Sequence, residues 1–276
     1  MRVKIYGCRG SVPLSHVNGS AYGGNTSCMT VQSSGIRLVV DAGSGMMQLF
    51  HESYARDIPF RWSSPCHILL SHLHFDHMIG LGTFQASWKN YYRTTVYTAS
   101  RDERPLVEQI VGAFQQPYWP YSLAEACKFD CIAVEHNTPF TIEHFTITPF
   151  WANHGDMTYS FHITDGRRTF VYLLDSETEG MSDAAYDELL SYCKDADLVV
   201  FDAAYAPDDY PRYKGWGHST VVHGIELARA CAPKRVLFSH FAQHYTDEQL
   251  DTWAQYYKNE ACSEFIMARE GMVVRL

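Results

Sequence analysis

The chain has 276 residues, of which 46% are hydrophobic, so it is long and apolar enough to bury a sizeable core. Its formal net charge of −9 disfavours a generic electrostatic grip on long nucleic acid or on an anionic membrane. Because the sequence has no run of about 18 apolar residues, no apolar signal-peptide region at its start and no Cys-x-x-Cys pair among eight cysteines, we expect a cytoplasmic protein without disulfides.

The first part of the chain predicts short strands separated by glycine-rich turns. We expect strands over residues 2–6, 26–32 and 36–41, followed by a helix over Gly45–Tyr54. A buried strand over residues 66–70 comes next. It leads directly into a group of histidines.

That group has the sequence Ser-His-Leu-His-Phe-Asp-His and holds three imidazoles and a carboxylate within six positions. Alternate residues of an extended chain point the same way, so His72 and His74 can share one ion while Asp76 and His77 turn towards a second. Imidazole and carboxylate suit zinc, manganese or iron, and the absence of a nearby cysteine argues against a closed structural zinc site. The motif therefore predicts two metal ions.

The second part of the chain repeats the layout of strands followed by helices, which indicates an α/β fold with sheets inside and helices outside. No linker rich in Gly, Pro or Ser divides the sequence, so we predict one domain over residues 1–276. The expected strands are 140–150, 159–164, 169–175, 197–202 and 235–240, and the expected helices are 182–194 and 221–231.

Further histidines and acids occur where these later strands end. His154 follows the strand 140–150, Asp175 ends the strand 169–175, and His240 ends the strand 235–240. Taken alone, such a histidine is more often a hydrogen-bonded structural residue, and such an acid often caps the next helix. Their order after the first motif changes this interpretation, because together they complete a set of ligands for two ions.

In this order of residues the chain resembles the metallo-β-lactamase-fold superfamily, whose members carry His-x-His-x-Asp-His, a distant His, a bridging Asp and a final His. The resemblance covers nearly the whole chain. It implies a four-layer αββα sandwich, in which two mixed sheets carry helices on their outer faces. It also implies two divalent ions, zinc first with manganese or iron as alternatives, and a hydroxide between them that attacks the substrate. The implied ligands are His72, His74 and His154 for one ion, Asp76, His77 and His240 for the other, and Asp175 for both.

The end of the chain is similar to that of ribonuclease Z and related cyclic-nucleotide phosphodiesterases. This likeness rests on residues 197–205, the run Gly-Trp-Gly-His-Ser-Thr at 215–220, and residues 236–245. It implies that His218 faces the phosphate and is paired with Asp202, where ribonuclease Z usually has Glu. His218 would stabilise the pentacoordinate phosphate or protonate the leaving alkoxide, so the predicted catalytic residues are Asp76, Asp202 and His218.

Other interpretations of these loops stay open. His218 can also be the neighbour of a helix cap, with Ser219 or Thr220 capping the helix 221–231. The loops 7–13 and 22–28 match the beginnings of small bacterial phosphodiesterase-like hydrolases, and Asn25 is either a donor to a substrate oxygen or a turn residue with positive φ. Asp41 resembles the superfamily's acid that orients a ligand histidine without touching the metal.

Residues 84–121 are predicted to be an aromatic-rich insertion. Its rings either stack a nucleobase at the cleft or pack in the core. The long basic arm with which ribonuclease Z clamps tRNA has no counterpart between Asp175 and His218, so we expect no long nucleic acid as a partner. The aromatic residues of the segment are Trp88, Tyr91, Tyr92, Tyr97, Tyr118 and Trp119.

The sequence therefore predicts a hydrolase that cleaves a small cyclic or nucleotide-like phosphodiester. The alternative, from a different class, is a di-iron protein that binds or senses dioxygen, because the superfamily also contains flavodi-iron proteins. Typical flavodi-iron sites have Glu where this chain has His74, and a flavodoxin-like domain is lacking, which favours hydrolysis. No membrane partner is expected. The sequence does not give the oligomeric state, and a homodimer would rest on family analogy alone.

Overall fold

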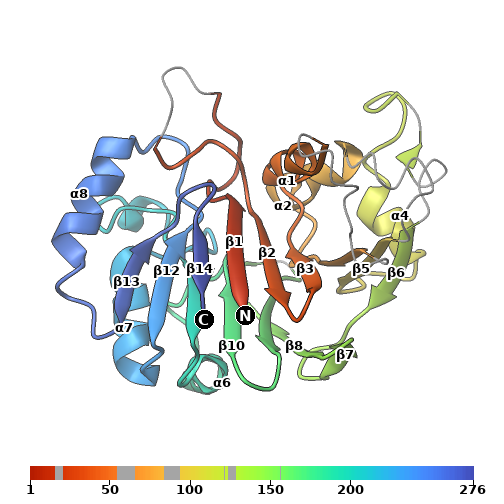
Figure 1. Ribbon diagram of the computed structural model, residues 1–276. Helices are drawn as coiled ribbons and strands as arrows, with labels where there is room; N and C mark the ends of the chain where they lie inside the picture. Colours follow the sequence, from red (N-terminus) through yellow and green to blue (C-terminus); the bar gives the residue numbers. More distant parts are fainter. Residues whose placement is uncertain (16–20, 55–65, 84–93, 121, 124–128, 156) are drawn as a thin grey trace.

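The computed structural model describes residues 1–15, 21–54, 66–83, 94–120, 122–123, 129–155 and 157–276. These residues form two mixed sheets of seven strands each, which lie face to face with helices outside them (Figure 1). The predicted α/β sandwich of two mixed sheets flanked by helices is confirmed. The prediction of one domain stays a prediction.

The first sheet contains most of the N-terminal half of the chain and has the order β14-β1-β2-β3-β4-β5-β6. Its strands run antiparallel from β14 to β3 and parallel from β3 to β6. The strands are β1 (Arg2–Gly7), β2 (Cys28–Ser33), β3 (Ile36–Val40), β4 (Cys66–Leu69), β5 (Thr94–Thr98), β6 (Phe129–Ala133) and β14 (Val273–Arg275).

The second sheet has the order β13-β12-β11-β10-β9-β8-β7. Strands β10 to β13 are parallel, and β7 to β10 are antiparallel. The strands are β7 (Phe140–Ile142), β8 (Phe145–Trp151), β9 (Tyr159–Thr164), β10 (Thr169–Leu173), β11 (Leu198–Asp202), β12 (Arg235–Ser239) and β13 (Glu264–Met267).

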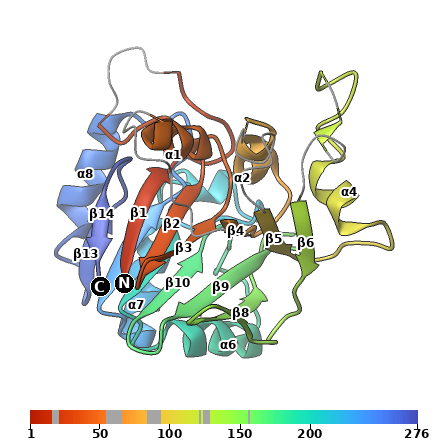
Figure 2. The same cartoon turned by 45° about the vertical axis from the view of Figure 1, so that its right-hand side comes forward.

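The helices cover the outer faces of the two sheets. Both ribbon views place α1 and α2 at the same upper edge of the sandwich, above the ends of the central strands (Figures 1 and 2). The helices are α1 (Gly45–Tyr54), α2 (Phe75–Met78), η1 (Ile79–Thr83), α4 (Leu106–Val111), α6 (Asp183–Cys193), η2 (Tyr210–Arg212), α7 (Val221–Cys231) and α8 (Asp247–Tyr257).

Side chains from the two faces of one strand pack in different layers of the core. In β3, Leu38 and Val40 belong to the core between the sheets, whereas Val39 between them packs in a second core under α1. Met46 and Leu49 of α1 are buried in this second core. Successive side chains of a strand point to opposite faces, so a strand covered on both sides must be apolar at every position, as β3 is at its end.

Four of the expected strands differ from those observed. The strand expected over residues 140–150 is a hairpin of β7 and β8, and Glu143 turns the chain between them with φ 53°. The strands expected to end at Asp41, Asp175 and His240 each end one or two residues earlier. These three residues have φ values of 57°, 52° and 69°. A non-glycine residue in this left-handed region is strained, and such strain is concentrated at functional sites.

The segment 84–121, predicted as an insertion, contains a strand of the first sheet. Strand β5 pairs with both β4 and β6, and the ring of Tyr97 in β5 stacks on Phe140 with centroids 5.3 Å apart. Trp119 packs edge-on against Phe114, while Tyr118 is exposed. Trp88, Tyr91 and Tyr92 lie outside the described residues. The described rings of this segment include one in the core, Tyr97, and one at the surface, Tyr118.

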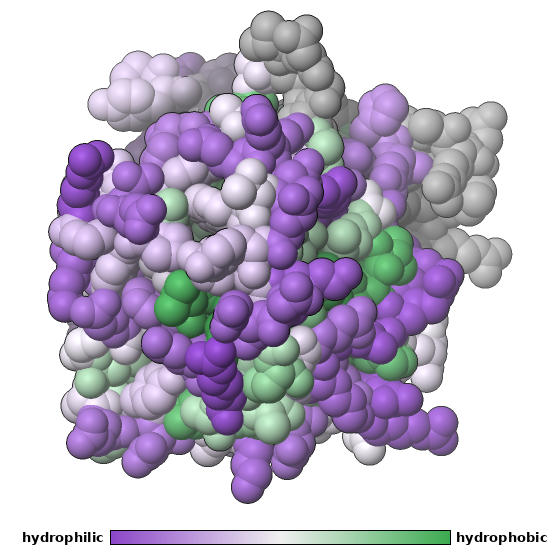
Figure 3. Space-filling view, turned by 90° about the vertical axis from the view of Figure 1, so that its left-hand side faces the viewer, coloured by the Kyte–Doolittle hydropathy of each residue, from purple (hydrophilic) through white to green (hydrophobic). Residues whose placement is uncertain are grey.

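The two ends of the chain lie side by side because β1 and β14 are paired, with Arg2 opposite Arg275 (Figures 1 and 2). The face of the molecule on the α8 side is largely hydrophilic, and its apolar areas are small and separate (Figure 3). None of the described helices has the length and apolar character needed to cross a membrane.

Candidate metal centre

The carboxyl ends of β4, β8, β10, β11 and β12 meet at one place, and all seven predicted ligands lie there. Each ligand belongs to a group whose ligand atoms all lie within 4.8 Å of one another. Parallel strands carry their carboxyl ends to the same edge of a sheet, which is where α/β proteins bind ligands. The groups are His72, His74 and His154; His72, His77 and Asp175; Asp76, His77 and His240; and Asp175, Asp202, His218 and His240.

The first group consists of three histidines. His154 Nδ1 donates to the carbonyl oxygen of Gly217 over 2.9 Å, so its Nε2 carries no proton in the neutral ring. That Nε2 lies 3.2 Å from Nδ1 of His74. His72 Nδ1 pairs with the hydroxyl of Ser71 at 3.0 Å, which leaves its Nε2 towards the group. Outer hydrogen bonds of this kind fix which nitrogen faces a metal.

The group of Asp76, His77 and His240 adds a carboxylate to two histidines. Asp76 Oδ2 accepts the backbone N–H of Ser11 over 2.8 Å, which places the 7–13 loop at the site as expected. His240 Nδ1 pairs with the hydroxyl of Ser27 at 3.1 Å. Gly10 lies directly against the His240 ring, where a Cβ would come within 2.5 Å of a ring carbon. A glycine is therefore needed at this position.

Asp41 orients His77, as its resemblance implied. Its Oδ2 accepts from His77 Nδ1 over 2.7 Å and from the Tyr172 hydroxyl over 2.6 Å. The backbone N–H and the hydroxyl of Ser71 also donate to this carboxylate. Asp41 is completely buried, and these four donors provide the hydrogen bonds that a buried carboxylate needs.

Asp175 lies between the two groups. Its Oδ2 is 3.1 Å from His77 Nε2, and its Oδ1 is 3.3 Å from His240 Nε2 and 3.6 Å from His154 Nε2. Burial alone would raise the pKa of Asp175, but His240 and His77 hold this pKa well below its usual range. Asp175 is therefore a carboxylate within reach of both groups.

Four buried atoms of this centre make no hydrogen bond of good geometry: Nε2 of His72, His77 and His240, and Oδ2 of Asp175, which has only the 3.1 Å ion-pair contact with His77 Nε2. Leaving a buried polar atom unsatisfied costs about 1–3 kcal/mol, so four of them at one place call for a bound species. Burial, followed by the neighbouring His77, keeps the pKa of His72 well below its usual value, so its lone pair is free. Imidazoles and carboxylates that converge in this way fit divalent metal ions.

His218 and Asp202 lie beside this cluster. His218 Nδ1 donates to Asp202 Oδ2 over 2.8 Å, and the His218 ring stacks on His240 with centroids 5.0 Å apart. Asp202 is completely buried and also accepts the backbone N–H groups of Asp175 and Ala204. Burial disfavours the charged form of His218, but the Asp202 carboxylate outweighs it and raises the pKa of His218 to about 9. Asp202 therefore favours the protonated form of His218.

The structure separates the two roles left open for the 218–220 segment. Thr220, and not Ser219, caps α7: its hydroxyl accepts from the backbone N–H of His223. The Ser219 hydroxyl instead donates to the carbonyl oxygen of Ser176 over 2.6 Å. His218 thus lies in the cluster while the helix is capped two residues later.

The Asn25 side chain makes its hydrogen bonds within the protein. Its Nδ2 donates to Glu270 over 3.0 Å, and its Oδ1 accepts from the Ser44 hydroxyl over 3.0 Å. It is not among the described residues with positive φ. The turn residue with positive φ is therefore not observed at this position.

Glu177 is a residue that the sequence analysis missed. Its buried carboxylate accepts the backbone N–H groups of Gly215 (2.8 Å) and Gly217 (2.9 Å) and the Tyr210 hydroxyl (2.5 Å). The backbone of Gly217 is thus held at its N–H by Glu177 and at its carbonyl oxygen by His154. An acid two residues after Asp175 was the signal available, although an isolated Glu in a loop is usually solvated.

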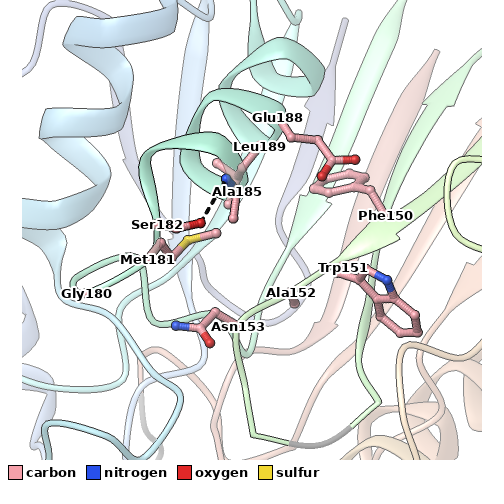
Figure 4. A pocket seen from close by; sticks show the side chains of 10 residues that line it. All are labelled: Phe150, Trp151, Ala152, Asn153, Gly180, Met181, Ser182, Ala185, Glu188 and Leu189. Atoms are coloured by element: carbon pink, nitrogen blue, oxygen red, sulfur yellow. Dashed lines mark hydrogen bonds between the residues drawn. The ribbon is translucent and has the colours of Figure 1, made fainter.

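A pocket of about 290 Å³ lies between the end of β8 and the start of α6. Met181 and Leu189 lie on one side of it, and Phe150 and Trp151 lie on the other (Figure 4). Its lining includes Asn153 but none of the predicted ligands. The pocket therefore adjoins the His154 loop and is separate from the metal-ligand groups.

A model of the Beta-lactamase superfamily domain matches residues 36–241. The chain belongs to the metallo-β-lactamase superfamily. The matched region includes all seven predicted ligands together with Asp202 and His218, so the resemblance is confirmed on the part of the chain that carries the site.

Two curated relatives match most of the chain. The probable metallo-hydrolase YhfI of Bacillus subtilis is 26% identical over 281 residues, which covers 99% of each chain. The crystal structure of YhfI has a TM-score of 0.75 to this structure. A ribonuclease Z of Azobacteroides pseudotrichonymphae is 23% identical over 270 residues, which covers 89% of each chain. These relatives support a hydrolase.

The same fold also carries different chemistry. CmlA, a di-iron β-hydroxylase from Streptomyces venezuelae, has a TM-score of 0.57 at 13% identity, and the match covers 91% of this chain and 53% of CmlA. At this identity the likeness concerns the fold alone, so the choice of reaction depends on the site.

Proposed function

We propose that the protein is a dinuclear-metal-dependent phosphodiesterase that hydrolyses a small cyclic or nucleotide-like phosphodiester. The observation that carries this proposal is the set of buried ligand atoms of His72, His77, Asp175 and His240, which converge beside the hydrogen-bonded pair of His218 and Asp202. A centre that gathers cations and a cationic donor suits an anionic substrate.

The ligands divide between two ions. His72, His74 and His154 would hold the first, Asp76, His77 and His240 the second, and Asp175 would contribute to both. When bound, two such ions ionise a water molecule near neutral pH and stabilise charge on the attacked and leaving oxygens. Zinc fits this donor set first, and manganese or iron also fits it.

His218 supplies the proton chemistry. Its Nδ1 is occupied by Asp202, so its Nε2 is the nitrogen left to donate to a phosphoryl oxygen or to the leaving alkoxide. Asp202 keeps the ring in one orientation and compensates its charge. Asp76 is assigned a catalytic role as well as a ligand role, because its carboxylate lies between Ser11, His77 and His240.

A small substrate is favoured over a long RNA by the charge of the segment between Asp175 and His218. Residues 176–217 contain ten carboxylates and three lysines or arginines. Phosphate backbones are bound by basic surfaces, and each contact adds to a salt-dependent affinity. An acidic segment at this position disfavours an extended grip on RNA, although a relative is a ribonuclease Z.

The test is turnover of bis(p-nitrophenyl) phosphate and cyclic nucleotides by protein loaded separately with zinc, manganese or iron. We expect hydrolysis with at least one metal and a loss of about 100-fold or more in kcat for His218→Ala. His51→Ala, at an exposed position of α1, is the matched control and should retain full activity. An absence of turnover with every metal contradicts the proposal, and so does an unaffected His218→Ala.

The same preparations separate hydrolysis from the di-iron alternative. Iron loaded anaerobically, with a visible absorption band that appears on adding dioxygen, would favour a dioxygen-binding protein. A cytoplasmic location and a homodimer stay predictions.

A further inference from the structure

A continuous series of ring contacts leads from His218 to the surface. Tyr205 meets His218 edge-on at 5.8 Å, and Tyr213 stacks on Tyr205 with centroids 4.1 Å apart and planes 5° from parallel. Trp216 meets Tyr213 edge-on at 5.5 Å. The exposed fraction rises along this series from 6% at Tyr205 to 64% at Trp216.

The support of the Trp216 ring is rigid. Glu177 binds the backbone N–H groups on both sides of Trp216, those of Gly215 and Gly217. The backbone N–H of Trp216 donates to the carbonyl oxygen of Tyr213 over 3.0 Å. An exposed indole on a backbone held at three successive residues loses little conformational entropy when it binds a ligand.

Trp216 is the exposed ring at the end of this series. Tyr213 is enclosed by Tyr205 on one side and by His244, whose ring lies 6.3 Å away, on another. Lys214, the cation nearest to Trp216 in the sequence, is paired with Glu179 over 2.5 Å. The indole of Trp216 therefore presents an aromatic face, which suits a planar ring better than a phosphate.

We propose that Trp216, supported by Tyr213 and Tyr205, is the stacking site for a nucleobase whose sugar phosphate lies at His218. Trp216 and His218 are two residues apart, so their Cα atoms are separated by at most about 7 Å, which one nucleotide spans. This inference rests on the proposed function, and it names the substrate class as a nucleotide ester. It places base stacking in the loop before His218, whereas the sequence left stacking by residues 84–121 as one of two interpretations.

The test compares two ligands that differ only in the base. Calorimetry with the full-length, metal-loaded protein would measure the affinities for adenosine 5′-monophosphate and for ribose 5-phosphate. We expect the nucleotide to bind about tenfold or more tightly, since stacking on one aromatic side chain contributes on that scale. Trp216→Ala should remove this difference and leave ribose 5-phosphate unchanged, while Trp216→Phe should restore most of it.

Tyr256→Ala is the matched control, because Tyr256 is 70% exposed on α8 and lies outside the ring series. It should not change either affinity. The proposal is overturned if the two ligands bind equally to the unaltered protein, if neither binds, or if Trp216→Ala weakens both equally. Base-dependent binding through Trp216 without turnover of any phosphodiester would contradict the hydrolase proposal and leave the stacking site standing.

Discussion

Asp202 accepts a hydrogen bond of 2.8 Å from His218 Nδ1, and the same carboxylate oxygen accepts the backbone N–H of Asp175 over 3.0 Å. One buried acid therefore positions both the proposed proton donor and the carboxylate proposed to contact both ions. This geometry couples the acid–base chemistry of the site to its metal chemistry.

Asp202→Asn should lower kcat by about 100-fold, because the amide keeps the shape but no longer compensates a charged His218. We expect His218→Ala to have an effect of similar size, and the double variant to be little worse than either single variant, since the two residues act as a unit. Steady-state kinetics of the three variants, with metal content measured in parallel, is the measurement. Fully additive losses in the double variant would contradict the coupling.

Asp41→Asn should weaken metal binding by about 10- to 100-fold, because Asp41 orients His77 through its Nδ1. Activity should recover in part when excess metal is added. Competition with a chromophoric chelator measures the affinity. Asp195→Asn, at an exposed position, is the control and should leave the affinity unchanged; an equal affinity in Asp41→Asn would rule out the orienting role.

The proposed metal ligands were predictable because they follow strands whose apolar character is plain in the sequence. Residues 68–70 and 236–238 are all apolar, and the polar residues that follow such a run lie at the edge of a sheet. The order of ligands in the metallo-β-lactamase superfamily then indicated which distant residues belong to the same site. Local periodicity alone does not show which strand ends will meet.

Other parts of the structure have no local signal. The turn at Glu143 lies within an alternating apolar run and contains no Gly or Pro, so the hairpin of β7 and β8 reads as one strand. Glu177 and Asn25 depend on long-range contacts with Gly217 and Glu270, and only the folded chain brings these partners together. Tertiary contacts determine such roles, and composition does not.

Glu177→Gln should lower kcat/KM by about tenfold, because an amide N–H₂ would face the backbone N–H groups of Gly215 and Gly217. The carbonyl oxygen of Gly217 also accepts the hydrogen bond from His154 Nδ1, so we expect KM and kcat to change together. Glu179→Gln is a matched control, since Glu179 lies two residues away and is exposed. Equal kinetics for the two variants would argue against a positioning role of Glu177.

Asp197 gives a pH-dependent contribution to stability at the far end of β11. Burial would raise its pKa, but Lys234 (2.7 Å), the Thr169 N–H (2.9 Å) and Arg168 (2.9 Å) lower it. Because the folded-state pKa lies below the unfolded value of about 3.9, this contribution is complete above about pH 4 and is lost as the pH falls through the folded-state pKa.

Asp197→Asn should therefore lower the free energy of unfolding by about 1 kcal/mol at pH 7, since two of the three partners are largely exposed. The difference from the unaltered protein should shrink as the pH falls below about 4. Urea unfolding at several pH values measures it, and kcat should not change because Asp197 lies at the opposite end of the strand from Asp202. A difference that is constant with pH would contradict the assignment.

The metal content of protein purified anaerobically decides whether the centre is dinuclear. Elemental analysis should find about two divalent ions per chain, and His74→Ala and His240→Ala, which alter different ligand groups, should each lose about one. A protein that holds no tightly bound metal, or that keeps the same metal content in both variants, would contradict the account.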